Sequence, residues 1–188
     1  MNLYRIIRII LIAAVTWVIL TMLMGCVEEI EQPAGADECE NSLGNVACDF
    51  AMMDQNGKQV NLYDFHGKVI VLDFSAMWCA PCQYAALDVE RTIEKYGIEN
   101  IVYLTVLIED SSGNTPDKRD LNKWADSFQI ESSPVLAGSR EWLDLSGYEL
   151  TGWPTFYFIT PTMVIKEYQR GYSKENLERA IEDLLAAQ

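Results

Sequence analysis

Residues 69–82 have the sequence Val-Ile-Val-Leu-Asp-Phe-Ser-Ala-Met-Trp-Cys-Ala-Pro-Cys, in which an apolar run leads directly into two cysteines. The nearly continuous apolar run Val69–Ser75 predicts a strand that is buried on both faces. Pro81 and the pattern after it predict a helix that begins at the cysteines and ends at Gly97. Unpaired N–H groups in the first turn of a helix favour a thiolate. The stretch therefore predicts a strand that delivers a reactive dithiol to a helix.

The bulk composition limits the class of protein and its partners. The chain has 188 residues, 49% of them hydrophobic and 22% charged, which is typical of one globular domain with extensions. Residues 1–25 hold two arginines and no acid, so the remainder carries 12 basic and 28 acidic residues, a formal charge of −16. Nucleic-acid binding needs a basic surface, so we expect no nucleic-acid partner. The acidity fits a soluble exposed domain, and steering of a basic partner protein is the alternative.

The N-terminus has the features of an export signal. Arg5 and Arg8 precede Ile9–Met24, sixteen residues without a charge, and Cys26 follows a glycine. Leu-x-Gly-Cys at the end of this run resembles the lipobox of bacterial lipoproteins, which implies removal of residues 1–25 and a lipid on Cys26. An uncleaved transmembrane anchor and ordinary cleaved secretion are the alternatives. Each version places the domain outside the cytoplasm, so we expect a cell-envelope protein, lipid-anchored to a bacterial membrane and facing the periplasm or the cell exterior.

Residues 26–45 predict a flexible tether, because they are rich in Glu, Gly, Ala and Asn and have little periodicity. The domain that follows is expected at 46–188. Cys39 and Cys48 lie within and just after the tether, and in an oxidising envelope they most simply form a structural disulfide. A second redox pair, unpaired thiols and intermolecular links are the alternatives, and the spacing does not decide between them.

The remaining pattern alternates strands and helices. Asn56-Gly57 between two short apolar pieces predicts a β-hairpin ahead of the central strand. Ile101–Ile108 predicts a second buried strand, and residues 117–128 predict an amphipathic helix. Two strands and a helix capped by Ser173 end the domain. This order predicts an α/β fold with a mixed central sheet, helices on both faces and an N-terminal hairpin extension.

A Cys-x-x-Cys pair serves either zinc binding or thiol–disulfide exchange. A structural zinc site needs four ligands, and only Cys39 and Cys48 could complete one, at a spacing that does not suit it. We therefore expect no metal and no cofactor. In exchange, Cys79 at the helix start would attack a substrate disulfide, and Cys82, one turn further and shielded, would resolve the mixed disulfide.

The Trp-Cys-Ala-Pro-Cys motif at 78–82, after a hydrophobic strand, resembles the active site of the thioredoxin superfamily. The segment 49–67 and Gly-Trp-Pro-Thr at 152–155 are similar to its TlpA/ResA-like branch of envelope thiol-disulfide oxidoreductases, and the resemblance covers roughly residues 46–187. It implies a thioredoxin-like fold. It also implies a membrane-anchored enzyme that reduces disulfides of envelope proteins, such as apocytochrome c, with electrons from an upstream membrane donor.

The resemblance also assigns roles to single residues. Pro154 matches the family's cis-proline beside the dithiol, and Trp153 would line the substrate groove and offer its backbone to an incoming peptide. For Trp153 a packing role is the alternative. Asp73 matches a buried acid that moves the proton of the second cysteine. A carboxylate paired to a lysine is the alternative for Asp73, but the strand that would supply the lysine offers only apolar residues here. The other groove residues implied are Trp78, Ala80 and Pro81.

Three functional questions stay open in the sequence. The direction of exchange depends on a reduction potential that residues alone do not give. A peroxidase of the peroxiredoxin type would have a threonine three residues before its cysteine, where this chain has Ala76. A binding or assembly module could keep the fold for its groove, although the intact Cys79/Cys82 pair argues against that.

Overall fold

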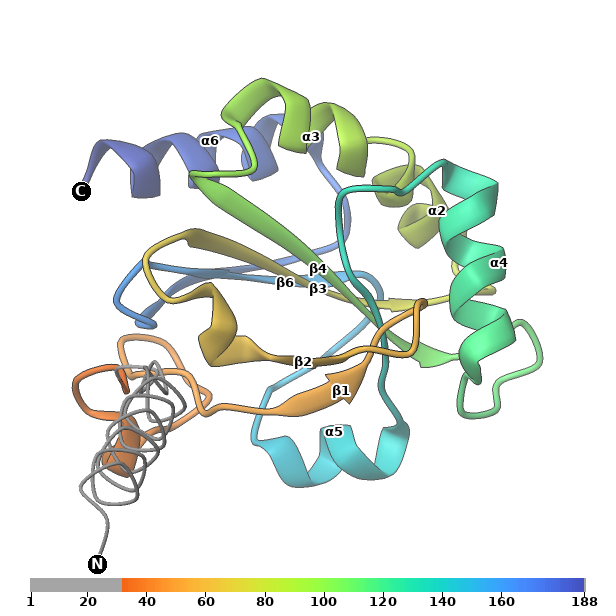
Figure 1. Cartoon of the computed structure of the whole chain (residues 1–188), viewed down its shortest axis with the longest axis horizontal. Coiled ribbons are helices and arrows are strands. Elements are labelled where there is room, and N and C mark those ends of the chain that lie inside the picture. The colour runs from red at the N-terminus through yellow and green to blue at the C-terminus, as the bar shows by residue number, and fades with distance from the viewer. Residues whose placement is uncertain (1–31, 188) are drawn as a thin grey trace, which may run out of the picture. The chain divides into compact units, whose positions relative to one another are not determined.

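The computed structural model describes residues 32–187. They form one five-stranded sheet and one two-stranded sheet (Figure 1). The strands are β1 (Ala51–Met53), β2 (Gln59–Asn61), β3 (Val69–Ala76), β4 (Ile101–Glu109), β5 (Val135–Ala137), β6 (Thr155–Ile159) and β7 (Ile165–Arg170). The 3-10 helices are η1 (Ala36–Glu38) and η2 (Leu62–Phe65), and the α-helices are α2 (Ala80–Ala86), α3 (Val89–Tyr96), α4 (Lys118–Phe128), α5 (Arg140–Ser146) and α6 (Lys174–Ala186).

Two predictions concern segments at the N-terminus. The export signal at 1–25 and the lipidation site Cys26 lie outside the described residues. Among residues 32–187, every helix is too short or too polar to cross a bilayer.

The large sheet has the strand order β5-β4-β3-β6-β7 and is mixed, as predicted. β3 runs parallel to β4 and antiparallel to β6. Ala76 lies opposite Glu109 of β4, and Phe74 lies opposite Thr155 of β6. The C-terminal end of β3 therefore meets the end of β4 and the start of β6. This end of the sheet carries the cysteine pair and the Trp153-Pro154 segment.

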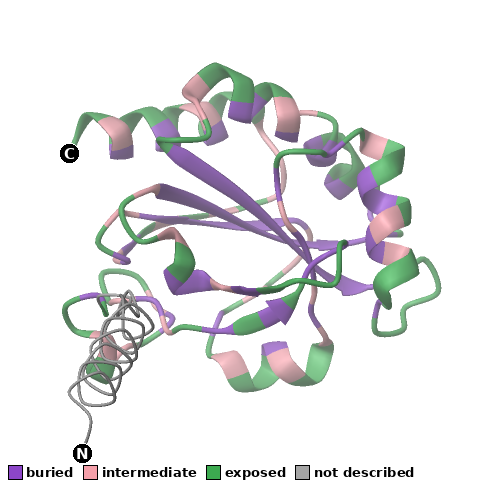
Figure 2. Ribbon diagram, viewed as in Figure 1, coloured by how far each residue is buried: buried purple, intermediate pink, exposed green. Residues whose placement is uncertain are grey.

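The two faces of the sheet pack against different elements (Figure 2). Every residue of β3 is buried, and its side chains alternate between the faces. Val69 and Val71 belong to a core shared with α2, α3, α4 and α6. Ile70, Leu72 and Phe74 belong to a core shared with β1, β2, η2 and α5. Burial of apolar surface on both faces is the main stabilising contribution to the fold. The packing of both faces confirms the predicted layered α/β fold.

Two local predictions meet different outcomes. The hairpin at Asn56-Gly57 is confirmed, since β1 and β2 pair antiparallel and Gly57 has a φ of +81°. One helix from the cysteines to Gly97 is wrong, because the chain forms α2 and α3 with a break at Asp88. The Asp88 carboxylate accepts a hydrogen bond from the Tyr172 hydroxyl, 84 residues away, and pairs with Arg91. A contact between residues so far apart in the sequence cannot be recognised from the local helical pattern.

The described part of the predicted tether belongs to the folded unit. Asn41 Nδ2 donates to the Ser146 carbonyl at 2.7 Å, and the Gly44 N–H donates to the Ile165 carbonyl at 2.8 Å. Ala36 packs against the core beneath the hairpin. A flexible tether is therefore wrong for residues 32–45, because hydrogen bonds to α5 and β7 hold this segment on the domain.

Candidate active site

The cysteine pair lies at the N-terminal end of α2, directly after β3. Cys79 is the N-cap residue, and its Sγ accepts a hydrogen bond from the Cys82 N–H at 3.3 Å. The two cysteines form a disulfide with their Cα atoms 5.3 Å apart. Cys79 keeps 4% exposure, while Cys82 is fully buried. Cys79 therefore keeps a small exposed surface in an electrostatic environment that favours a thiolate, and Cys82 has the shielding expected of a resolving thiol.

The surface around Cys79 is apolar. Ala80 and Pro81 are the first residues of α2 and are exposed. Trp78 is 50% exposed and Tyr84 is 65% exposed. The sequence carries no charged side chain from residue 77 to residue 87. A substrate that approaches Cys79 from this side meets mainly apolar side chains.

Asp73 is a buried carboxyl on β3, with 1% of its surface exposed. By alternation with Val71, its side chain points to the sheet face that packs against α2. It accepts hydrogen bonds from Ser75 Oγ at 2.7 Å and from Tyr103 Oη at 3.2 Å. Burial raises the pKa of Asp73 to about 7, and the two hydrogen bonds oppose this rise. A carboxyl with such a pKa exchanges a proton readily near neutral pH.

The partners of Asp73 correct the sequence interpretation of β4. That strand is not only apolar, because Thr105 lies opposite Asp73 and Tyr103 reaches it from two residues earlier. Among the described residues, the carboxylate of Asp73 is bonded to the Ser75 and Tyr103 hydroxyls rather than to a lysine. The parallel register of two buried strands was the signal that could have identified Tyr103, since the sequence predicts both strands.

The Trp153-Pro154 segment lies at the same end of the sheet. Its peptide bond is cis, and Pro154 is buried just before β6. Trp153 is partly buried and packs against the core cluster that contains Cys79 and Cys82. Within the described residues, the Trp153 backbone N–H and C=O form no hydrogen bond. Trp153 thus packs against the domain and also leaves main-chain groups for an extended peptide.

The second cysteine pair is far from the first along the sheet. Cys39 and Cys48 form a disulfide with a Cα separation of 4.9 Å, and both are half-buried. The neighbouring Ala47 N–H donates to the Met163 carbonyl in the β6–β7 turn. That turn lies at the opposite end of β6 from Pro154. The position favours the structural interpretation of this disulfide over exchange with the first.

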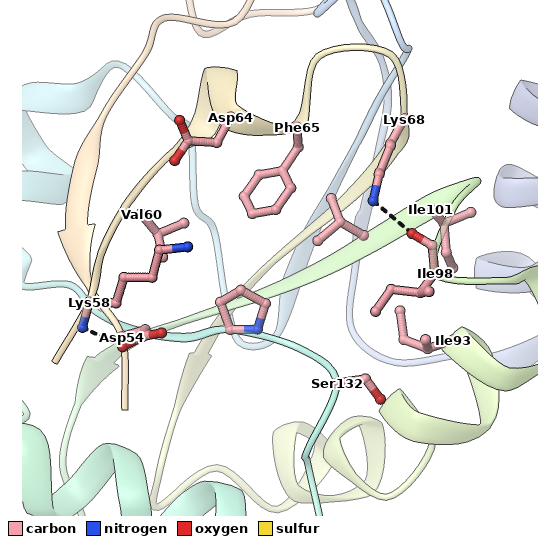
Figure 3. A pocket seen from close by; sticks show the side chains of 12 residues that line it. Asp54, Lys58, Val60, Asp64, Phe65, Lys68, Ile93, Ile98, Ile101 and Ser132 are labelled. Atoms are coloured by element: carbon pink, nitrogen blue, oxygen red, sulfur yellow. Dashed lines mark hydrogen bonds between the residues drawn. The ribbon is translucent and has the colours of Figure 1, made fainter. Parts of the chain in front are cut away.

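A cavity of about 540 Å³ opens near the start of β4 (Figure 3). Ile101, Val102 and Phe65 line it, with Lys58 and Lys68 also on its walls. Because β3 and β4 are parallel, their starts lie at the end of the sheet opposite the dithiol. The cavity includes none of the predicted site residues. Within residues 32–187, no three His, Cys, Asp or Glu side chains are grouped so as to hold a metal ion.

Comparison with known sequences gives a family and named relatives. Residues 43–168 match the AhpC/TSA family. The thiol-disulfide oxidoreductase ResA of Geobacillus kaustophilus is 25% identical over 144 residues, which cover 76% of this chain and 78% of the relative. The ResA protein of Bacillus subtilis is 25% identical over 136 residues, which cover 72% of each chain.

Solved structures show the same fold. A Chlorobium tepidum protein described as the thiol:disulfide interchange protein DsbE superposes with a TM-score of 0.64 at 26% identity, over 77% of this chain and 98% of that one. The exposed lipoprotein thioredoxin Etrx1 of Streptococcus pneumoniae superposes with a TM-score of 0.57 at 27% identity, over 75% of this chain and all of that one. The family match at residues 43–168 includes both the dithiol and the Trp153-Pro154 segment.

Proposed function

The chain belongs to the AhpC/TSA family, and from this membership and its thioredoxin-like fold we propose how it works as a thiol-disulfide oxidoreductase. Cys79 is the attacking thiol and Cys82 is the resolving thiol. The observation that carries this assignment is the position of the pair, with Cys79 at the start of α2 and 4% exposed, and Cys82 fully buried behind it.

Reduction of a substrate proceeds in two exchange steps. The Cys79 thiolate attacks one sulfur of the substrate disulfide, forms a mixed disulfide and releases the other sulfur as a thiolate that takes up a proton. Cys82 then gives its proton to the Asp73 carboxylate, and its thiolate attacks Cys79 Sγ. This step releases the second substrate sulfur as a thiolate, which takes up a proton, and leaves the Cys79–Cys82 disulfide. An external donor of two electrons and two protons must reduce that disulfide before the next turnover.

Asp73 supports the second step as a proton acceptor. Its pKa of about 7 leaves both protonation states populated at neutral pH, so it can take a proton from the resolving thiol and return it later. The Ser75 and Tyr103 hydroxyls stabilise the carboxylate form that accepts this proton.

The proposed direction is reductive, on disulfides of envelope proteins such as apocytochrome c, with electrons from a membrane donor. The names of the ResA relatives and the DsbE structure support an exchange activity, and the export signal predicted from the sequence supports the compartment. A lipid on Cys26 would hold the domain at the membrane. Cys26→Ser should move the protein from the membrane fraction to the soluble fraction if this anchor is correct.

Trapping of partners tests the proposed function. Cys82→Ser should freeze the mixed disulfide on Cys79, so that envelope proteins co-purify through a bond that a reductant cleaves. Cys79→Ser in the same cells is the matched control and should trap none. Rapid peroxide consumption that survives Cys82→Ser would instead indicate a peroxidase. Normal cellular function of Cys79→Ala would indicate a binding or assembly module.

A further inference from the structure

One chain of contacts joins Trp78 to Trp153. Trp78 Nε1 donates a hydrogen bond to Glu109 Oε2 at 2.7 Å, and Arg140 Nε donates to Glu109 Oε1 at 2.5 Å. The Arg140 Cζ atom lies 5.4 Å from the centroid of the Trp153 ring, within the range of a cation–π contact. We call these four residues the tryptophan bridge. It connects the turn before Cys79 with the segment before Pro154.

Glu109 is the centre of the bridge. It ends β4 opposite Ala76, and its carbonyl accepts a hydrogen bond from the Met77 N–H. Its side chain is 11% exposed. The hydrogen bond from Arg140 lowers the pKa of Glu109, and the bond from Trp78 adds to this effect. Glu109 is therefore an anion that accepts from both neighbours, one on each carboxylate oxygen.

Arg140 places the positive charge of the bridge at the surface. It is the first residue of α5, and its side chain is 57% exposed. Arg140 and Trp153 also border a cavity of about 510 Å³. Because this side chain faces solvent and a cavity, replacing it removes the bridge without emptying a packed core.

The bridge has no net charge, and its two ends are large apolar rings. Tryptophan offers a wide contact area and loses little side-chain entropy when it is fixed. Trp78, Tyr84 and Pro81 are exposed beside Cys79. When a polypeptide brings its disulfide to Cys79, the residues that flank the substrate cysteine therefore contact these exposed apolar side chains. A small disulfide reaches the same sulfur without these contacts.

We propose that Glu109 and Arg140 are positioning residues that hold Trp78 and Trp153 as two walls of the substrate groove. The groove then selects disulfides whose flanking polypeptide carries apolar side chains. This inference rests on the exchange activity proposed for Cys79. It predicts that loss of the bridge weakens binding of such polypeptides and leaves the reactivity of the dithiol unchanged.

The test compares two substrates across matched variants of the full chain. Reduction of a peptide disulfide flanked by leucines and of a small aromatic disulfide is followed at pH 7 with Arg140→Met and Arg140→Lys. Arg179→Met is the control, because Arg179 forms an exposed ion pair with Glu167 away from the dithiol. Glu109→Gln is the second probe, since it keeps an acceptor for Trp78 and removes the charge.

Arg140→Met should raise KM for the leucine-flanked peptide about fivefold, with kcat nearly unchanged and the small disulfide reduced at the wild-type rate. Arg140→Lys should recover part of this KM, because it keeps a cation beside Glu109 and the Trp153 ring. Equal losses on both substrates, or no change of KM, would overturn the proposal. Failure of the proposed exchange activity would look different, because the wild-type protein would then reduce neither substrate.

Discussion

The molecule contains two disulfides whose surroundings differ. Cys79–Cys82 caps a helix, lies in the core layer that also receives Asp73, and follows a fully buried strand. Cys39–Cys48 joins two loop positions, and within residues 32–187 neither cysteine lies at the N-terminus of a helix. There, Asn41 Oδ1 accepts from the Cys48 N–H, and Asn41 Nδ2 bonds to α5. Under the proposed function, one of these disulfides exchanges with substrates and the other links two loops, and it is their environments that differ.

The largest effect should come from replacing cysteines in each of the two pairs in turn. Cys79→Ser should lower the rate of disulfide exchange by at least about a thousandfold, because the variant lacks the attacking thiol at the helix start. The double variant Cys39→Ser/Cys48→Ser should change that rate less than about twofold. Steady-state reduction of a peptide disulfide measures both. Comparable losses in the two proteins would remove the distinction between the pairs.

Asp73→Asn should slow the exchange and stabilise the fold. The resolving step at pH 7 should slow about a hundredfold, because Cys82 loses its proton acceptor. The pKa of Asp73 is about 7 in the fold and near 3.8 in an unfolded chain, so ionisation destabilises the native state as pH rises. The variant should gain up to about 4 kcal/mol in free energy of unfolding above pH 7 and almost nothing below pH 4.

Urea unfolding at pH 4 and pH 8, with the disulfides intact, measures this gain. Asp64→Asn is a suitable control, because Asp64 is exposed and caps η2. A gain for Asp73→Asn that is independent of pH would show that its charge is not the cause.

Removal of the Cys39–Cys48 bond should affect stability more than activity. The bond closes a short loop with a sequence separation of 9. This loop lowers the conformational entropy of the unfolded chain. Cys39→Ala/Cys48→Ala should lower the free energy of unfolding by about 2–3 kcal/mol. Thermal unfolding of the oxidised proteins tests this. An unchanged unfolding temperature would argue against a structural role for the bond.

The smallest effect is expected for Tyr103→Phe. Its hydroxyl stabilises the Asp73 carboxylate, so its loss should raise the pKa of Asp73 by about one unit. The pH at which exchange reaches half its maximum should rise by the same amount. The pH–rate profile checks this, with Tyr84→Phe on the exposed face of α2 as the control. A profile that moves to lower pH would contradict the assigned hydrogen bond.

Local patterns predicted much of the fold and of the candidate site. The Asn56-Gly57 turn and the buried strand before Cys79 follow from short-range rules that the structure confirms. Two contacts between distant segments had no signal in the sequence. Tyr172 contacts Asp88, at the break between α2 and α3, across 84 residues, and the Glu109–Arg140 pair forms across 31 residues. Both contacts depend on the three-dimensional arrangement, which brings together residues that are far apart in the sequence.

The most direct test of the difference between the two disulfides follows both bonds during turnover. Thiols are alkylated with one reagent while the protein is reducing a substrate, the remaining disulfides are then reduced and alkylated with a second reagent, and the peptides are quantified by mass spectrometry. Cys79 and Cys82 should appear in both labelled forms in proportions that follow the supply of reductant. Cys39 and Cys48 should carry only the second label. Appearance of the first label on Cys39 and Cys48 at the same rate would contradict the assignment of one catalytic and one structural disulfide.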